Sequence, residues 1–106
     1  MSERYQVVVT EAFQADIERL EAHIVQRELD SHTPDEDCLF RFRDALARAF
    51  GILAFAPHTC RRSEAHREFR ELIVPFGHGG CVVLFAIRDP QVVLLAVRDQ
   101  HELDFH

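Results

Sequence analysis

The sequence predicts a single α+β domain, in which an antiparallel helical hairpin packs on an antiparallel-rich sheet of about four strands. Three observations support this. Apolar residues recur every three to four positions between Phe13 and Leu53, as in amphipathic helices, and they form short β-branched runs before and after that stretch. The third observation is size, because 106 residues of which 47% are hydrophobic suffice for one compact core. We therefore expect residues 1–106 to form one domain.

The first strand is predicted at residues 5–10, where the sequence YQVVVT is rich in β-branched side chains. The period then changes to that of a helix. Four apolar residues are spaced by four, three and four positions and so share one helix face: Phe13, Ile17, Leu20 and Ile24. We expect this helix to end near Asp30.

A second helix is predicted to open at Thr33. Thr33 suits the N-cap, Pro34 the first helical position, and Glu36 completes a capping box. The apolar face then continues through Leu39, Phe42, Leu46, Phe50 and Leu53. Because Pro57 disfavours a helical residue before it, the helix must stop there. A short connection between the two helices predicts an antiparallel hairpin.

Three strands are predicted after a basic link at residues 58–67. They cover residues 69–76, 81–87 and 92–97, and the turn sequences GHGG and RDPQ separate them. Tight turns between successive strands predict an antiparallel meander. The middle strand is almost wholly apolar, so we expect it to be central. The complete order is β-α-α-β-β-β.

The charge is unevenly distributed along the chain. The net charge of −6 divides into −7 for residues 1–38, +4 for residues 39–70 and −3 for residues 71–106. This excludes a generally basic nucleic-acid binder and indicates one basic segment on an acidic body. All twelve basic side chains are arginines. Because arginine stays protonated, any mechanism that needs a lysine as proton carrier is excluded.

Several other classes of site are not expected. The three cysteines, Cys38, Cys60 and Cys81, are widely spaced without a CxxC motif, so we expect small buried residues rather than a disulfide framework. His58 and Cys60 could form one edge of a metal site, but no second ligand pair exists at matching spacing. The GHGG turn opens no helix and so predicts no phosphate loop. We expect neither metal nor cofactor.

The sequence predicts a cytoplasmic protein. No stretch approaches the roughly 20 apolar residues that span a bilayer. The N-terminal MSERYQ is charged and then polar, unlike a signal peptide.

The second half of the chain resembles a known family. The stretch FRELIVPFGHGGCVVLFAI, followed by VVLLAVRDQHELDFH, resembles the C-terminal half of RelE/ParE superfamily toxins of type II toxin–antitoxin systems. In the nearest, ParE-like branch, arginine–glutamate opens the strand, a PFG turn follows, the last strand ends in AVRHQ and the tail in YH. The resemblance covers the whole order of elements and is weaker in the helices. Three residues depart from the branch: Asp99 replaces histidine, and Cys81 and Phe105 replace tyrosine.

The resemblance implies a function and partners. A cognate antitoxin would bind the toxin in a hetero-oligomer and neutralise it, and a groove for a partner helix is implied. ParE-like toxins poison DNA gyrase without chemistry of their own, whereas RelE-like toxins cut mRNA on the ribosome. The missing lysines and tail tyrosine favour a non-enzymatic gyrase inhibitor. Two alternatives stay open: a ribosome-dependent mRNA endonuclease, and a weakened toxin that acts mainly in an autorepressor complex with its antitoxin.

Candidate site residues follow from charge and position. The cluster of Arg61, Arg62 and Arg67 suits an acidic partner, either a phosphate backbone or antitoxin carboxylates, but is equally consistent with an exposed link. Arg98 ends the last strand, and Arg70 opens an earlier one, where it could instead be a paired structural residue. We expect target or antitoxin binding to involve Arg61, Arg62, Arg70, Arg98 and Phe105.

A nuclease would need a different set. Histidine is the side chain that can act as acid or base near pH 7, although solvated turn and tail histidines are common. The candidates are Arg70, Arg98, His78, His101 and His106. For the tail we favour a strap, in which Phe105 packs on the sheet or the hairpin, over a reaction centre.

Overall fold

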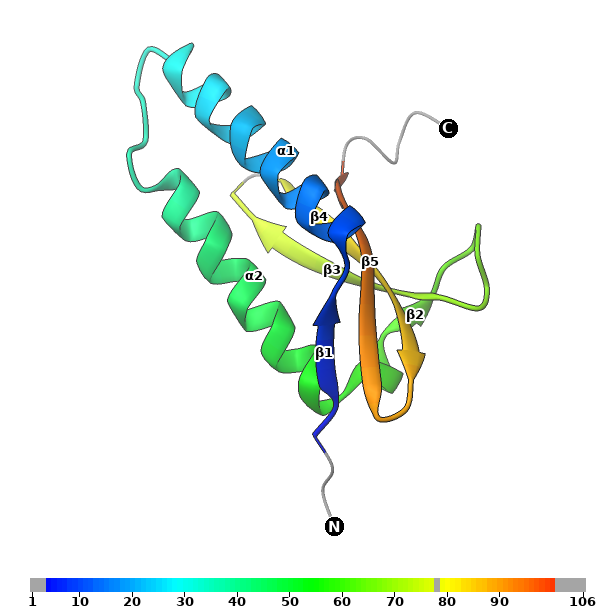
Figure 1. Cartoon of the computed structure of the whole chain (residues 1–106). Helices are drawn as coiled ribbons and strands as arrows, with labels where there is room; N and C mark the ends of the chain where they lie inside the picture. The colour runs from blue at the N-terminus through cyan, green and yellow to red at the C-terminus, as the bar shows by residue number, and fades with distance from the viewer. Residues whose placement is uncertain (1–3, 78, 101–106) are drawn as a thin grey trace.

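The computed structural model describes residues 4–77 and 79–100. The chain forms a helical hairpin on one face of a sheet (Figure 1). The elements are, in order, β1 (Gln6–Val9), α1 (Glu11–Leu29), α2 (Cys38–Phe55), the 3-10 turn η1 (Pro57–Thr59), β2 (Arg61–Arg62), β3 (Arg70–Phe76), β4 (Gly79–Arg88) and β5 (Gln91–Asp99). The predicted α+β class and β-α-α-β-β-β order are confirmed. The two-residue strand β2, which lies in the basic link, was not predicted.

The sheet is mixed rather than fully antiparallel. Its strand order is β1-β5-β4-β3-β2, so β4 is central, as predicted. The three strands β3, β4 and β5 form the expected antiparallel meander, and β2 adds to the outside of β3. β1 pairs in parallel with β5, which joins the two ends of the chain in one sheet.

Helix α1 forms where the apolar spacing predicted it. The Thr10 hydroxyl at the N-cap accepts a hydrogen bond from the Phe13 amide at 3.1 Å. Phe13, Leu20 and Ile24 are buried, and the helix ends with Asp30 as its C-cap, as expected. An ion pair from Arg43 Nε to Glu21 Oε2, 2.7 Å long, links α1 to α2.

The predicted start of the second helix is wrong. α2 begins at Cys38 rather than after Thr33, and its N-cap residue Asp37 makes no side-chain capping bond. The cause is local competition for backbone amides. Asp35 Oδ1 accepts the Asp37 amide at 3.0 Å, and Glu28 Oε1 accepts the Asp35 amide at 2.7 Å. These carboxylates satisfy the amides in a turn and remove the reason to begin the helix earlier.

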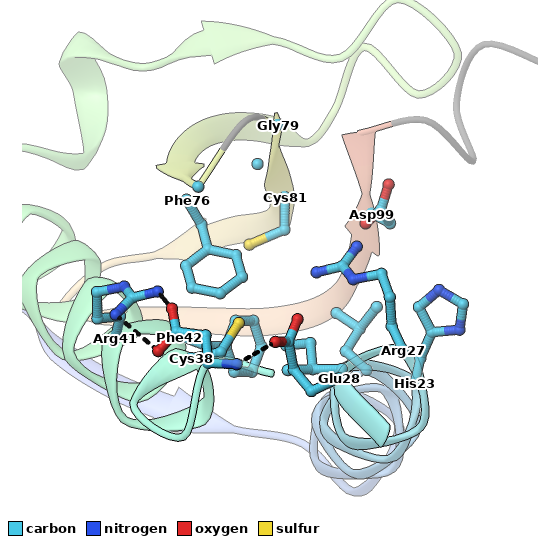
Figure 2. Close-up of a pocket in the computed structure, with 15 residues that line it drawn as sticks. His23, Arg27, Glu28, Cys38, Arg41, Phe42, Phe76, Gly79, Cys81 and Asp99 are labelled. Atoms are coloured by element: carbon cyan, nitrogen blue, oxygen red, sulfur yellow. Dashed lines mark hydrogen bonds and ion pairs between the residues drawn. The ribbon is translucent and has the colours of Figure 1, made fainter. Parts of the chain in front are cut away.

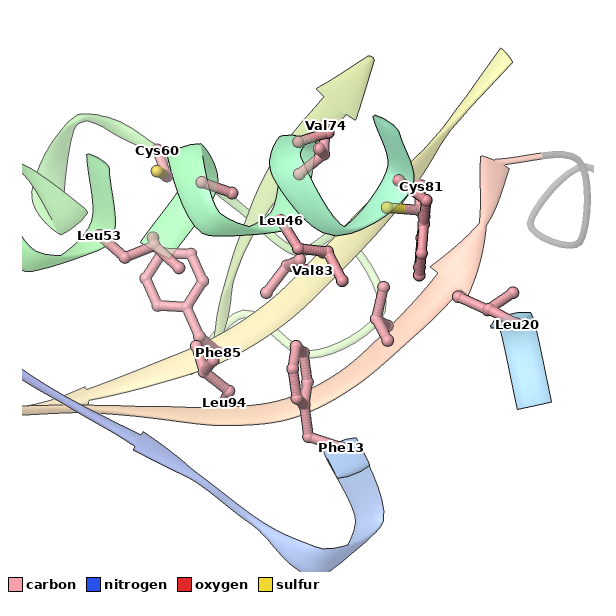
Figure 3. Packing of buried hydrophobic residues seen from close by; sticks show 14 of the residues in the cluster. Phe13, Leu20, Leu46, Leu53, Cys60, Val74, Cys81, Val83, Phe85 and Leu94 are labelled. Carbon is pink, nitrogen blue, oxygen red and sulfur yellow. The ribbon is translucent and has the colours of Figure 1, made fainter. Parts of the chain in front are cut away.

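The core lies between the hairpin and the sheet (Figure 3). Phe13 from α1, Leu53 from α2, and Phe85 and Leu94 from the central strands have no solvent-exposed surface. The predicted positions Leu20, Ile24, Phe42 and Leu46 belong to the same cluster. Cys38, Cys60 and Cys81 are buried free thiols, which confirms that they serve as small buried residues.

Candidate functional site

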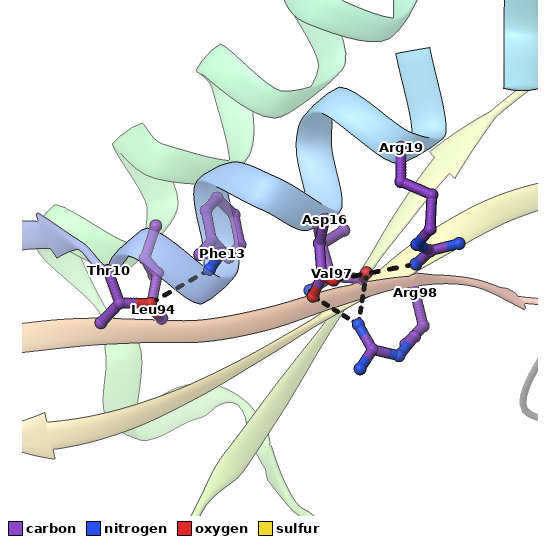
Figure 4. Close-up of polar contacts among 7 residues, drawn as sticks. All are labelled: Thr10, Phe13, Asp16, Arg19, Leu94, Val97 and Arg98. Carbon is purple, nitrogen blue, oxygen red and sulfur yellow. Dashed lines mark hydrogen bonds and ion pairs between the residues drawn. The ribbon is translucent and has the colours of Figure 1, made fainter. Parts of the chain in front are cut away.

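Arg98 is bonded to helix α1 (Figure 4). β1 ends at Val9, whereas β5 continues to Asp99. Beyond the end of β1, helix α1 packs along the edge of β5. The Asp16 carboxylate accepts bonds from the Val97 amide at 3.1 Å and from the Arg98 guanidinium. Nearer the start of α1, the Thr10 hydroxyl donates to the Leu94 carbonyl at 2.7 Å. Arg98 thus helps to hold α1 on the exposed edge of β5.

Arg70 is bonded to backbone carbonyls. Its Nη1 donates to the Cys60 carbonyl at 2.7 Å and to the His58 carbonyl at 3.3 Å. These bonds attach η1 and the start of β2 to β3. Because Arg70 pairs across the strands with the core residue Phe85, it lies on the helix-covered face. No carboxylate among residues 4–77 and 79–100 is paired with it.

The remaining predicted arginines lie on β2, with their side chains on opposite faces. Arg61 Nε donates to Glu71 Oε1 at 3.0 Å across the strand pair. Arg62 pairs with Arg70, and its Nη1 donates to the Arg67 carbonyl at 3.1 Å. The predicted cluster of three arginines is therefore divided, because Arg61 is neutralised on one face and Arg62 lies on the other.

Arg70 and Arg98 do not converge on a common point. Arg98 pairs across the strands with Val82, outside the core cluster, whereas Arg70 pairs with Phe85 inside it. The two arginines therefore point to opposite faces of the sheet. His78, His101, Phe105 and His106 lie outside the described residues, so their predicted roles stay predictions.

A cleft of about 450 Å³ lies between the two helices and the end of the sheet (Figure 2). Its walls come from the second half of α1, the first turns of α2, and the β3–β4 turn with Asp99. The floor is apolar, and Phe42 contacts Phe76 edge-on with ring centroids 5.5 Å apart. The other apolar floor residues are Leu20, Ile24, Cys38 and Cys81.

Charged groups surround this apolar floor. Arg41 is paired with Asp35, and Glu28 accepts the Asp35 amide, so these three groups are bonded to one another. Arg27 also lines the cleft, and it has no carboxylate partner within the described part of the chain. Arg27 and Arg41 were not predicted from the sequence as site residues. The available signal was their position beside the apolar stripes, three residues after Ile24 and one before Phe42.

Two buried thiols, Cys81 in the cleft and Cys60 beside Arg70, are poor nucleophiles. Burial, and secondarily the Asp99 carboxylate, raise the pKa of Cys81 to about 11. Burial also raises the pKa of Cys60, against a smaller opposing effect of Arg70. Because the thiolate is the reactive form, neither residue suits nucleophilic catalysis near neutral pH.

Residues 4–77 and 79–100 contain no group of three or more histidine, cysteine or acidic side chains placed to hold a metal ion. No helix in the same part of the chain has the length and apolarity required to cross a membrane.

Comparison with known proteins identifies the fold. No protein-family model matches the sequence, and no curated protein is significantly similar to it. Solved structures do match. A chain from the toxin–antitoxin complex RelBE2 of Mycobacterium tuberculosis is 19% identical with a TM-score of 0.58, over 92% of this chain and 93% of that one. The chain has a RelE/ParE-like fold.

Two other matches agree with this assignment. A chain from the chromosomal ParDE system of P. aeruginosa has a TM-score of 0.67 at 11% identity, over 91% of this chain and 96% of that one. A conserved hypothetical protein of Helicobacter pylori has a TM-score of 0.51 at 15% identity, over 93% and 98% of the two chains. RelBE and ParDE chains both match, so the fold does not distinguish the ParE-like branch from the RelE-like one.

Proposed function

We propose that this chain is the toxin of a toxin–antitoxin pair and that a cognate antitoxin binds and neutralises it. The observation that carries the proposal is the fold, which matches chains from two toxin–antitoxin systems over more than nine-tenths of this chain. The sequence resemblance in the second half supports the same assignment independently. Such a toxin would act in the cytoplasm.

The cleft between the hairpin and the sheet is the proposed antitoxin site. An apolar floor with a charged rim suits an amphipathic segment whose apolar side chains enter and whose polar side chains stay at the edge. Arg27 supplies a cation without a carboxylate partner among the described residues, so it can bind an antitoxin carboxylate without breaking an existing ion pair.

Co-purification with the cognate antitoxin tests the antitoxin site. Arg27→Glu should weaken the complex by about tenfold or more, because it replaces an attraction at the rim by a repulsion. Arg88→Glu is the matched control, since Arg88 is exposed at the end of β4 far from the cleft-lining residues Gly79 to Cys81. Equal loss of binding in both variants would mean that the effect is general electrostatics and not the cleft.

For the target we propose DNA gyrase, inhibited without catalysis by this chain. The arrangement of the arginines supports this choice, since Arg70 and Arg98 lie on opposite faces and each is bonded within the fold. Cleavage of RNA by 2′-hydroxyl attack needs an acid, a base and cations focused on one phosphate. The described residues do not place an acid, a base and cations around one common point.

Plasmid supercoiling by purified gyrase tests the target. Increasing amounts of the protein should abolish supercoiling, and protease treatment of the products should release linear DNA. If gyrase is unaffected, ribosome-bound mRNA should be assayed for cleavage, and a positive result there would replace the gyrase proposal. If both assays are negative, the weakened toxin in an autorepressor complex is favoured, and expression of the protein alone should cause little growth arrest.

A further inference from the structure

The edge of the sheet at β3 is only partly covered. β2 pairs with Arg70 and Glu71, and no other described strand lies on that side of β3. The following five residues, with the sequence LIVPF, therefore form an open edge beside α2 (Figure 1). Natural proteins usually protect such edges with charged side chains, and this segment has none; proline is the single protecting residue.

The direction of the backbone groups along this edge can be derived. The Phe69 carbonyl faces the β2 side, because it accepts the Ser63 amide at 2.9 Å. The Val74 carbonyl faces β4, because it lies 2.6 Å from the position that a Cβ would take on Gly80. The N–H and C=O of one residue point to the same side of a strand, and those of the next residue point to the other side. The N–H and C=O of Ile73 and the C=O of Pro75 therefore point outward, away from β4. Ile73 thus offers the outward N–H, since proline has none.

A groove lies next to these outward groups. Its volume is about 320 Å³, and α2 forms its wall with Ala45, Ala49 and Ile52. The two alanines leave space beside the strand. Ile52 and Ile73 are apolar yet 48% and 39% exposed. An added strand could therefore place an apolar side chain here, where it would cover surface that is otherwise in water.

One cation, Arg48, lies at the rim of the groove. The Arg48 side chain is 75% exposed, and its ion pair is with Asp44, which is 48% exposed, at 3.1 Å. An exposed pair of this kind contributes little energy, so Arg48 can exchange its partner. A carboxylate on the incoming segment would find the cation next to the apolar groove.

We propose that the β3 edge binds an extended acidic segment of another protein, which adds to the sheet as a strand in line with β2. Ile73 pairs with the main chain of the segment, the groove receives an apolar side chain, and Arg48 binds a carboxylate. A second copy of the LIVPF segment is a poorer occupant because it brings no acid to Arg48. This surface differs from the antitoxin cleft and does not depend on the toxin assignment.

Amide hydrogen exchange measured by NMR on the full chain tests the proposal. The probe is an acetylated and amidated hexapeptide of alternating valine and glutamate, and the matched control peptide carries lysine in place of glutamate. The Ile73 amide should exchange rapidly in the free protein and about tenfold more slowly with millimolar glutamate peptide. The lysine peptide should have no such effect.

Three variants complete the design. Arg48→Ala should reduce the protection by up to about fivefold while leaving the fold intact, because Arg48 is exposed. Ile73→Pro removes the outward N–H and should abolish binding measured from peptide-induced shifts of the groove residues. Arg88→Ala is the control and should bind normally. Unchanged exchange of Ile73, equal protection by both peptides, or full binding by Arg48→Ala would each overturn the proposal.

Discussion

Replacing Asp16 by alanine tests how α1 is held on the sheet. The Asp16 side chain is only 16% exposed and accepts bonds from the Val97 amide and the Arg98 guanidinium. Alanine removes both. The Val97 amide belongs to a fully buried residue at a point where β1 has already ended, so no neighbouring strand replaces the lost acceptor.

Most of the expected loss in the free energy of unfolding comes from the Val97 amide, which is left without an acceptor. A buried donor left without a partner costs about 1–3 kcal/mol. Loss of the Arg98 ion pair adds at most about 1 kcal/mol, because Arg98 is 43% exposed and can be hydrated instead. The free energy of unfolding should therefore fall by about 2–3 kcal/mol, which corresponds to roughly 10 °C in Tm for a domain of this size. Asp16→Asn keeps an acceptor for the amide and should cost about 1 kcal/mol.

Urea unfolding followed by far-ultraviolet circular dichroism gives these differences directly. Arg48→Ala is the control, because it breaks an exposed pair within one helix and should change the free energy of unfolding by less than about 0.5 kcal/mol. If Asp16→Ala costs no more than this control, the carboxylate does not hold α1 on β5. If Asp16→Asn lowers the free energy of unfolding as much as Asp16→Ala does, the ion pair with Arg98 contributes more to stability than the hydrogen bond from the Val97 amide.

Three further outcomes are expected from the same unfolding assay. Gly51→Ala should raise the free energy of unfolding by about 1 kcal/mol, because Gly51 lies inside α2 and a Cβ there meets nothing within 4 Å. Gly80→Ala should lower it by about 1–3 kcal/mol, since its Cβ would come within 2.6 Å of the Val74 carbonyl oxygen, and a smaller loss would show that the strand can shift. The pKa of the Cys81 thiol is raised from its ordinary 9.0 to about 11, so the folded state prefers the protonated form; stability should fall as the pH rises from about 9 towards 11, and Cys81→Ala should flatten that dependence.

Hydrophobic periodicity predicted the elements better than it predicted their boundaries. The spacing of Phe13, Leu20 and Ile24 fixes one face of α1, because burial of that face is the main source of helix stability. The start of α2 depends instead on a few hydrogen bonds. Glu28 supplies one of them from the preceding helix, seven residues before the Asp35 amide that it caps, and no capping motif within Thr33–Glu36 reveals that contact. β2 has two residues and was too short to produce a pattern.

The site was less predictable for a related reason. The sequence shows that Arg98 follows an apolar strand, but not that Asp16, 82 residues earlier, pairs with it. The partners of Arg70 are backbone carbonyls. Every residue has a backbone carbonyl, so the sequence gives no sign of which ones an arginine will bind. The pairing of Arg61 with Glu71 follows from the register of β2 and β3, so predicting it required knowledge of β2. Whether an arginine is available to a target is thus a property of the tertiary structure.

This placement limits how the protein can engage a nucleic acid. Arg61 and Arg98 are paired with carboxylates, and Arg70 would have to give up backbone bonds to reach a phosphate. Arg62 and Arg67 remain as exposed cations of the predicted basic region, on a body with a net charge of −6. Two phosphate contacts would give a salt slope of only about −2, far below that of proteins held by the nucleic-acid backbone. Arg62 and Arg67 would therefore supply little of the affinity for a nucleic acid, so the toxin that we propose would have to bind its target largely through other surfaces.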